Sequence, residues 1–204
     1  MKLFFFLPLL LVSTSIGLPI YQRSTNVTCL FMLDLQSLGI SNEAITTYEK
    51  FYNFALLVAS KLNDVSDFTG YIDNFGYTTG LDNHNTYPVY NYENVKAAPF
   101  FIDGTDDSID LDLKDVDASL RIAKWEPTPK DNTCMIFFSA APESTFGGTT
   151  IKTTYDSFTT VVGVIVRDGL TSIPGLPDPV VAVTMTDEDA QAVVQKLLTS
   201  LNSY

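Results

Sequence analysis

Short apolar runs that end abruptly in polar residues are the clearest pattern along this chain. One such run opens residues 29–38, CLFMLDLQSL, and another with nearly the same layout opens residues 134–144, CMIFFSAAPES. Apolar runs without polar alternation are typical of strands covered on both faces, as in the parallel sheet of an α/β fold. If these two strands are neighbours, their carboxyl ends open onto one crevice, where open α/β sheets usually bind ligands.

Helical spacing of apolar residues follows the first of these runs and returns at the end of the chain. Residues 42–62 carry a broad apolar stripe and are preceded by Ser41, which can cap a helix. Thr186 can cap a final helix over residues 187–201, whose acidic first turn is favourable beside the helix dipole. Three shorter helices are predicted over residues 95–101, 116–125 and 150–158.

The remaining apolar and aromatic segments predict strands. Residues 68–77 and 86–92 are rich in aromatic and β-branched side chains and are joined by turn-forming residues, so they predict a β-hairpin. Residues 160–166 and 180–185 predict two more strands. Strands that alternate with helices imply an α/β fold with a mostly parallel central sheet, one antiparallel hairpin at its edge and helices on both faces.

The first residues have the pattern of a secretory signal peptide. A basic start at Lys2 is followed by an apolar core of about ten residues and by small residues at Ser15 and Gly17. A transmembrane anchor would need about twenty apolar residues, and polar residues interrupt this run too early. We therefore expect a secreted, extracellular protein with a signal peptide at residues 1–17, an N-terminal segment at 18–27 and one domain at 28–204.

The composition limits the partners of the protein. The chain carries 12 basic and 24 acidic residues and a formal net charge of −12, and loss of Lys2 with the signal peptide makes the mature chain slightly more negative. An acidic surface of this size argues against nucleic acid and anionic membranes as partners. No later segment is long and apolar enough to span a bilayer. We therefore expect neither a nucleic-acid partner nor a membrane span.

Cys29 and Cys134 are the only two cysteines. In an exported protein an even pair suggests a disulfide. Each stands at the amino end of its predicted strand, so adjacent parallel strands would bring the two sulfur atoms together. The bridge would close a loop of about a hundred residues and add about 4 to 5 kcal/mol of stability in the chain-entropy model. A metal site or a catalytic thiol is the alternative.

Two sequons for N-glycosylation precede the two predicted core strands. Asn26-Val27-Thr28 has the common form, so we predict a glycan on Asn26. Asn132-Thr133-Cys134 has only the rare form with cysteine, and a disulfide at Cys134 would remove its thiol.

In the order and spacing of these elements the chain resembles a von Willebrand factor type A (VWFA) domain. The resemblance covers residues 28–201 and rests on the strand CLFMLDLQS with its long amphipathic helix, on the hairpin, on CMIFFSA, on VVGVIVRDG and on the final VVAVTMTDEDAQAVVQKLL. It implies a Rossmann-like three-layer sandwich and a role in adhesion, extracellular matrix or host defence. The proline-rich segment after VVGVIVRDG departs from the family, because it is too short for the helix usual there.

Many members of that family hold a divalent cation at the top of the sheet. The ligands come from an Asp-x-Ser-x-Ser motif after the first strand, a threonine of a middle loop and an aspartate after the fourth strand. The positions of this chain that correspond to the site or lie beside it are Asp34, Gln36, Ser37, Thr105 and Ser139.

Most of the ligands that this site needs are missing. Asp34 matches the leading aspartate, whereas Gln36 and Leu38 replace the two serines and Ser37 is out of register. Ser139-Ala140-Ala141 stands where the family has Thr-Asp-Gly, and Thr105 or Ser108 is the candidate hydroxyl of the middle loop. A hard cation such as Mg²⁺ requires near-octahedral oxygen ligation. We therefore expect a degenerate site and no cofactor, with at most weak binding of Mg²⁺ or Ca²⁺.

Other candidate chemistry is sparse. Residues 106–117 place aspartates at calcium-loop spacing, but Leu111 stands where an EF-hand needs glycine. We interpret this segment as a solvated loop or an edge strand, with weak Ca²⁺ binding as the alternative. His84 is the only histidine and has no second histidine for zinc and no evident nucleophile. The sequence has no nucleophile elbow and no phosphate-binding loop.

These patterns favour a secreted, non-enzymatic VWFA-like domain that binds an extracellular protein or matrix ligand. Its expected ligand face is formed by Asp34, Gln36, Ser37, Thr105 and Ser139. The first alternative is a metal-dependent adhesion domain in which Asp34, Ser37 and Thr105 hold Mg²⁺ or Ca²⁺ weakly while the partner supplies a carboxylate. The second alternative is a hydrolase on an α/β scaffold, which requires a nucleophile within hydrogen-bonding reach of His84.

Overall fold

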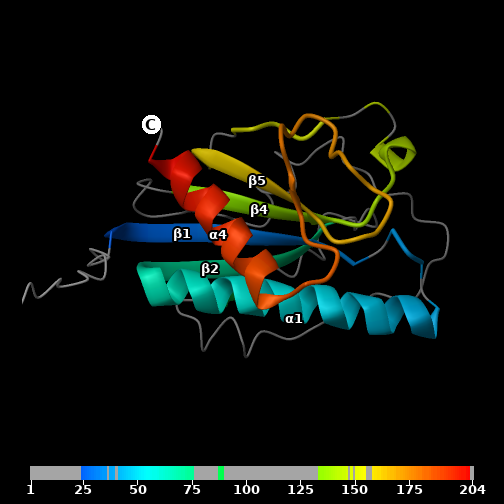
Figure 1. The fold of residues 1–204 in the computed structure, drawn as a ribbon, viewed down its shortest axis with the longest axis horizontal. Coiled ribbons are helices and arrows are strands. Elements are labelled where there is room, and N and C mark those ends of the chain that lie inside the picture. Colours follow the sequence, from blue (N-terminus) through cyan, green and yellow to red (C-terminus); the bar gives the residue numbers. More distant parts are fainter. Residues whose placement is uncertain are drawn as a thin grey trace, which may run out of the picture.

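The computed structural model describes residues 24–35, 37–39, 41–75, 87–89, 133–146, 148, 150–154 and 158–202, and the structural statements below concern these residues. They form an α/β fold in which two long helices pack on a mostly parallel sheet (Figure 1). In chain order the elements are β1 (Ser24–Asp34), α1 (Asn42–Val65), β2 (Ser66–Phe75), β3 (Tyr87–Val89), β4 (Thr133–Ser139), the 3₁₀ helix η2 (Glu143–Phe146), β5 (Thr160–Ile165), β6 (Val180–Val181) and α4 (Asp187–Leu201).

The strand order β3-β2-β1-β4-β5-β6 places β1 near the centre of the sheet. Strands β2, β1, β4, β5 and β6 are parallel, and β3 pairs antiparallel with β2 at one edge. The chain leaves β1 toward β2 on one side and later returns to β4 on the other side. The carboxyl ends of β1 and β4 therefore form the topological switch point, which is where ligands bind in open α/β sheets.

The predicted hairpin is described only in part. Three residues of β3 pair antiparallel with Gly70, Tyr71 and Ile72 of β2. The turn that would join the two strands, residues 76–86, lies outside the described residues. The hairpin itself therefore stays a prediction.

Alternate residues of the central strands face two separate layers of the core. On one face, Phe31 of β1 and Phe138 of β4 pack with the buried sides of α1 and α4. The rings of Phe31 and Phe138 stack with their centroids 6.1 Å apart, and Phe54 of α1 meets Phe138 edge to face. Figure 1 shows both helices on the near side of the sheet, with α4 beside α1. Both long helices were predicted from the sequence, and α1 extends three residues beyond the predicted end.

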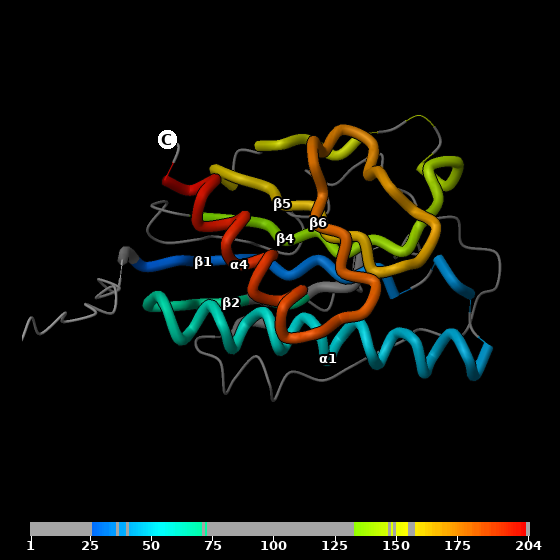
Figure 2. The backbone as a smooth tube through the Cα atoms, in the orientation of Figure 1, coloured from blue at the N-terminus to red at the C-terminus, as the bar shows by residue number. Residues whose placement is uncertain are grey.

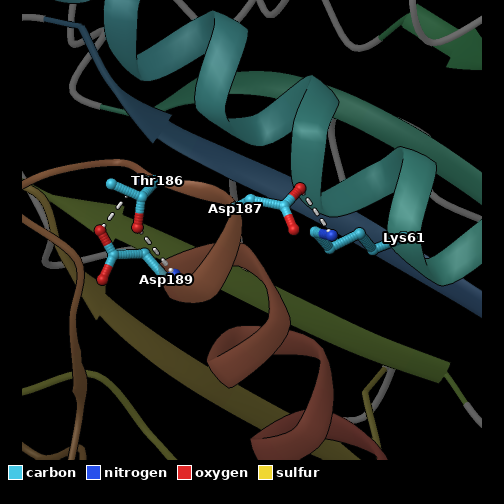
Figure 3. A network of polar contacts seen from close by, with 4 residues as sticks. All are labelled: Lys61, Thr186, Asp187 and Asp189. Atoms are coloured by element: carbon cyan, nitrogen blue, oxygen red, sulfur yellow. Dashed lines mark hydrogen bonds and ion pairs between the residues drawn. The ribbon is translucent and has the colours of Figure 1, made fainter.

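Each long helix begins at its predicted cap. The hydroxyl of Ser41 accepts a hydrogen bond from the backbone N–H of Ala44 at 3.2 Å. At α4 the cap is reciprocal: the hydroxyl of Thr186 accepts from the N–H of Asp189 at 3.3 Å, and the Asp189 carboxylate accepts from the N–H of Thr186 at 3.0 Å (Figure 3). These bonds satisfy donors that have no partner within the helix. None of the helices among the described residues is long and apolar enough to cross a membrane.

The start of α4 is also tied to α1. The ammonium of Lys61 lies 2.7 Å from a carboxylate oxygen of Asp187, and Figure 3 shows this ion pair beside the capping residues. Partial burial opposes ionisation of Asp189, but hydrogen bonds from Thr184 and Thr186 outweigh it and lower the pKa of this carboxyl. The carboxylate of Asp189 therefore stays charged in the first turn of α4, where a negative charge favours the helix dipole.

The opposite face of the sheet is covered, within the described residues, by irregular chain from the segment 146–176. The predicted helix over residues 150–158 is wrong for residues 150–154 and 158, none of which is helical. Their backbone groups bond to other segments instead: the N–H of Ile151 donates to the carbonyl of Pro174 at 2.8 Å, and the carbonyl of Thr153 accepts from the N–H of Val161 at 3.0 Å. The helices predicted over residues 95–101 and 116–125 lie outside the described residues.

The proline-rich loop after β5 lies directly on this second face. Gly163 of β5 allows the close approach, because a Cβ atom there would lie 2.9 Å from Cδ1 of Leu176 and 3.0 Å from Cδ1 of Ile173. The last strand is shorter than predicted. β6 has only two residues, instead of the predicted six over 180–185, because the chain turns after Ala182 and the N–H of Met185 donates back to its carbonyl at 3.2 Å.

Candidate functional site

A disulfide joins the two central strands. Cys29 and Cys134 are directly paired in the parallel register of β1 and β4, with their Cα atoms 4.5 Å apart, and both side chains are buried. The predicted bridge is therefore confirmed. Cys29 lies in the middle of β1 rather than at its amino end, because β1 begins at Ser24. The bridge ties together the two strands whose carboxyl ends form the switch point.

The carboxylate of Asp34 occupies the switch point itself. Asp34 ends β1, and its side chain is 0% exposed. It accepts hydrogen bonds from the hydroxyl of Ser37 at 2.6 Å, from the backbone N–H of Ser37 at 2.9 Å and from the backbone N–H of Ala140 at 3.0 Å. Ala140 is the first residue after β4. The carboxylate therefore bridges the loop that leaves β1 and the end of the neighbouring strand.

A tyrosine from α1 holds the rest of this loop. The phenol oxygen of Tyr48 accepts from the N–H of Leu38 at 2.8 Å and donates to the carbonyl of Gly39 at 3.0 Å. Its side chain is buried, and desolvation is the main cause that raises the pKa of Tyr48, with a smaller contribution from the negative charge of Asp34. The phenol therefore stays neutral and keeps both its donor and its acceptor function.

The ends of β4 and β5 are linked beside this point. The backbone N–H of Val166 donates to the carbonyl of Ser139 at 3.0 Å, and the Ser139 hydroxyl accepts from the N–H of Ala141 at 3.2 Å. The exposed guanidinium of Arg167 donates to the carbonyl of Ala140 at 3.3 Å. The carboxyl edge of the sheet thus consists of loops that are bonded to each other.

The structure brings together three of the five predicted ligand-face residues. Asp34, Ser37 and Ser139 meet at the ends of β1 and β4, whereas Gln36 and Thr105 lie outside the described residues. The side chains of Asp34 and Ser139 are buried, so a ligand at this edge would first meet the loops around them. Residues 106–117 and His84 also lie outside the described residues.

Three contributors to the site were not predicted. The apolar stripe of residues 42–62 includes Tyr48 without distinguishing it, although its position in the second turn of α1 lets it reach back to the preceding loop. Arg167 follows the apolar run that begins in β5 and ends at Val166, which is a signal for a residue at the carboxyl edge. The backbone N–H of Ala140 carries no sequence signal, because every residue except proline has one.

A cation at the switch point would have to compete with the protein's own donors. Among the described residues, no group of three or more histidine, cysteine, aspartate or glutamate side chains is placed to hold a metal ion. The carboxylate of Asp34 and the hydroxyl of Ser37, both candidate ligands, are hydrogen-bonded to each other. The Asp34 carboxylate acts in this structure as an acceptor that positions neighbouring backbone.

Replacement of Tyr48 by phenylalanine tests how the loop is held. We expect Tyr48→Phe to lower the free energy of unfolding by about 1 to 3 kcal/mol at neutral pH, because the Leu38 N–H and the Gly39 carbonyl both lose their partner. Urea unfolding measures the change. Thr46→Ala, which removes an exposed hydroxyl from the same helix, is the control and should not destabilise the protein.

The same pair of proteins should differ in their dependence on pH. Because the pKa of Tyr48 is raised in the folded state, its contribution is fully present below the pKa of an unfolded tyrosine, about 10, and is lost as the pH rises further. The stability difference between wild type and Tyr48→Phe should therefore shrink above about pH 10. If wild type and Tyr48→Phe are equally stable at neutral pH, or if their stability difference stays constant above about pH 10, Tyr48 does not hold the loop as described.

A scan against models of known protein families found no match, and no curated protein matches the chain. The resemblance to a VWFA domain therefore stays a prediction from the order and spacing of the sequence segments.

Proposed function

We propose that the chain is a secreted, non-enzymatic VWFA-like domain that binds an extracellular protein or matrix ligand without a functional metal site. A mostly parallel sheet with an antiparallel edge strand, a long helix after β1 and a capped final helix support this proposal. The disulfide fits an oxidising, extracellular compartment. The three-layer sandwich with helices on both faces is part of the proposal, because residues 95–101 and 116–125 would supply the second helical layer.

The burial of Asp34 is the observation that carries the metal-free part of the proposal. Moving a charged carboxylate out of water is costly unless hydrogen bonds compensate for the lost hydration. Asp34 receives this compensation from Ser37 and from the backbone of Ala140. A cation would have to displace these donors and then lacks a second carboxylate after β4, where Ala140 stands.

The exposed loops around the switch point are the proposed ligand face. Gly39 lies exposed after β1, and Arg167, Asp168 and Gly169 lie exposed after β5. The space between the ends of β1 and β4 is crossed by the hydrogen bond from Ala140 to Asp34. Small molecules usually need a concave pocket, whereas a surface made of loops suits a macromolecule. An extracellular protein is therefore the ligand class that we favour.

A metal-dependent adhesion domain is the second candidate. The Oγ atom of Ser37 and the Oδ2 atom of Asp34 lie 2.6 Å apart, which leaves an oxygen pair at the position where the family holds its cation. Thr105, the third oxygen that this candidate needs, lies outside the described residues. The hydrolase alternative depends on His84, which also lies outside them.

Calorimetric titration with Mg²⁺ and with Ca²⁺ separates the first two candidates. For the oxidised, secreted protein we expect no saturable heat at millimolar cation, because the donors around Asp34 already occupy the site. The metal-dependent candidate instead requires a saturable heat that Asp34→Asn abolishes. Asp168→Asn, which neutralises an exposed aspartate at the same edge, is the matched control. A heat that is lost in Asp34→Asn and retained in Asp168→Asn would overturn the metal-free proposal.

Site-specific cross-linking tests the ligand face. A photoreactive residue in place of Asp168, at the carboxyl edge, should capture a discrete protein from the extracellular material of the producing tissue. The same residue in place of Gln195, on the exposed side of α4, should not capture that protein. Electrophoresis of the cross-linked product gives the result. Equal capture at both positions, or capture only at position 195, would contradict a ligand face at the switch point.

A further inference from the structure

The amino end of β1 carries a second candidate site, far from the switch point. Asn26-Val27-Thr28 is a sequon, in which the side-chain amide of asparagine is the acceptor and threonine supplies the required hydroxyl. Such a sequence is modified only where the asparagine lies at the surface of an exported protein. The structure therefore decides whether the sequon is compatible with a glycan.

We propose that Asn26 carries an N-linked glycan, that Asn132 carries none, and that the glycan marks the end of the sheet opposite the ligand face. Asn26 is exposed, although Val27 beside it is buried under the helices. The pairing of β1 with β4 begins only at Thr28, opposite Thr133. Figures 1 and 2 show the amino end of β1 extending past β4, so Asn26 lies outside the pairing of these two strands.

The second sequon differs in its second and third residues, while Asn132 itself lies outside the described residues. In Asn132-Thr133-Cys134 the required third residue is Cys134, whose sulfur is bonded to Cys29 and whose side chain is buried. Thr133 is buried as well. Once the disulfide forms, the thiol needed at the third position is gone. The same bridge that ties β1 to β4 therefore removes the competing acceptor.

Glycosylation transfers an oligosaccharide to Asn26 from a donor in which the sugar is linked to a lipid diphosphate. The side-chain nitrogen of Asn26 forms a bond to the anomeric carbon of the sugar and loses one proton. The bond from that carbon to the phosphate oxygen breaks, and the lipid diphosphate departs with the electron pair. No oxidant or metal ligand from this chain takes part.

The position of the glycan bears on the ligand face. Asn26 and Asp34 lie at opposite ends of the same strand, which at about 3.3 Å per residue separates them by about 26 Å. A glycan at Asn26 therefore covers the amino edge of the sheet and leaves the loops at its carboxyl edge accessible. This inference needs export of the chain, which the proposed function also needs, but it does not depend on any ligand.

The test is expression of the full chain in eukaryotic secretory cells, followed by digestion of the secreted protein with a peptide N-glycosidase. We expect the enzyme to shift the mobility of wild type, Asn132→Gln and Thr28→Ser, which retain the acceptor and a hydroxyl. We expect no shift for Asn26→Gln and Thr28→Ala. When the glycan of the wild type is released in heavy-oxygen water, the asparagine that carried it becomes an aspartate labelled with heavy oxygen. Mass spectrometry should find this labelled aspartate at position 26. This measurement uses the wild type alone, so the test stands even if a variant fails to fold.

The possible failures are distinguishable. A secreted wild type without a glycan, or a label at position 132, would overturn the inference and leave the proposed binding function intact. A chain that never enters the secretory pathway would overturn both.

Discussion

The parallel pairing of β1 with β4 is the constraint on which the rest of this structure depends. It joins two segments that are more than a hundred residues apart in the sequence, and bringing the ends of so long a loop together costs conformational entropy. The backbone ladder from Thr28 to Leu33 is fastened by a disulfide near its beginning and by the hydrogen bond from Ala140 to Asp34 beyond its end. The disulfide and this hydrogen bond therefore hold β1 and β4 in register on both sides of the ladder, before any ligand is present.

The hydrogen bonds of Asp34 give this buried carboxylate a structural role at the end of β1. Hydrogen bonds to an ionised carboxylate are stronger than those between neutral groups. Asp34 receives such bonds from two segments, and Tyr48 holds the same loop from the helix side. The carboxylate thus organises the loops that form the proposed ligand face. The two ends of β1 would then differ: the carboxyl end carries the buried carboxylate of Asp34, and the amino end carries the proposed glycan on Asn26.

Much of the described fold could be predicted from local patterns. The disulfide followed from two cysteines that each precede an apolar run, and the starts of α1 and α4 followed from Ser41 and Thr186, which act on nearby backbone groups. The predicted helix over residues 150–158 failed because Ile151 bonds to Pro174 in the loop after β5, and Thr153 bonds to Val161 of β5. The length of β6 depended instead on a local turn after Ala182, which the apolar pattern of residues 180–185 does not reveal.

In the candidate site, too, local sequence patterns predicted some features and missed those that depend on tertiary contacts. The apolar run that ends at Asp34 predicted a carboxylate at the carboxyl end of a strand, and Ser139 was placed beside it by the matching run in β4. The pattern did not predict that Asp34 would be buried, because burial depends on the backbone N–H of Ala140 and on the loop that Tyr48 holds. Those partners are fixed only when helix, loop and sheet are assembled.

Amide hydrogen exchange at Ala140 tests the central claim most directly, because this N–H donates to the Asp34 carboxylate. The comparison is between wild type and Asp34→Asn, with the amide of Ile136 in the middle of β4 as the internal reference. If the carboxylate closes the switch point, Ala140 is protected in wild type and exchanges roughly tenfold faster or more in the variant, which corresponds to the loss of about 1.4 kcal/mol, while Ile136 changes less. Equal exchange rates of Ala140 in the two proteins would contradict the account.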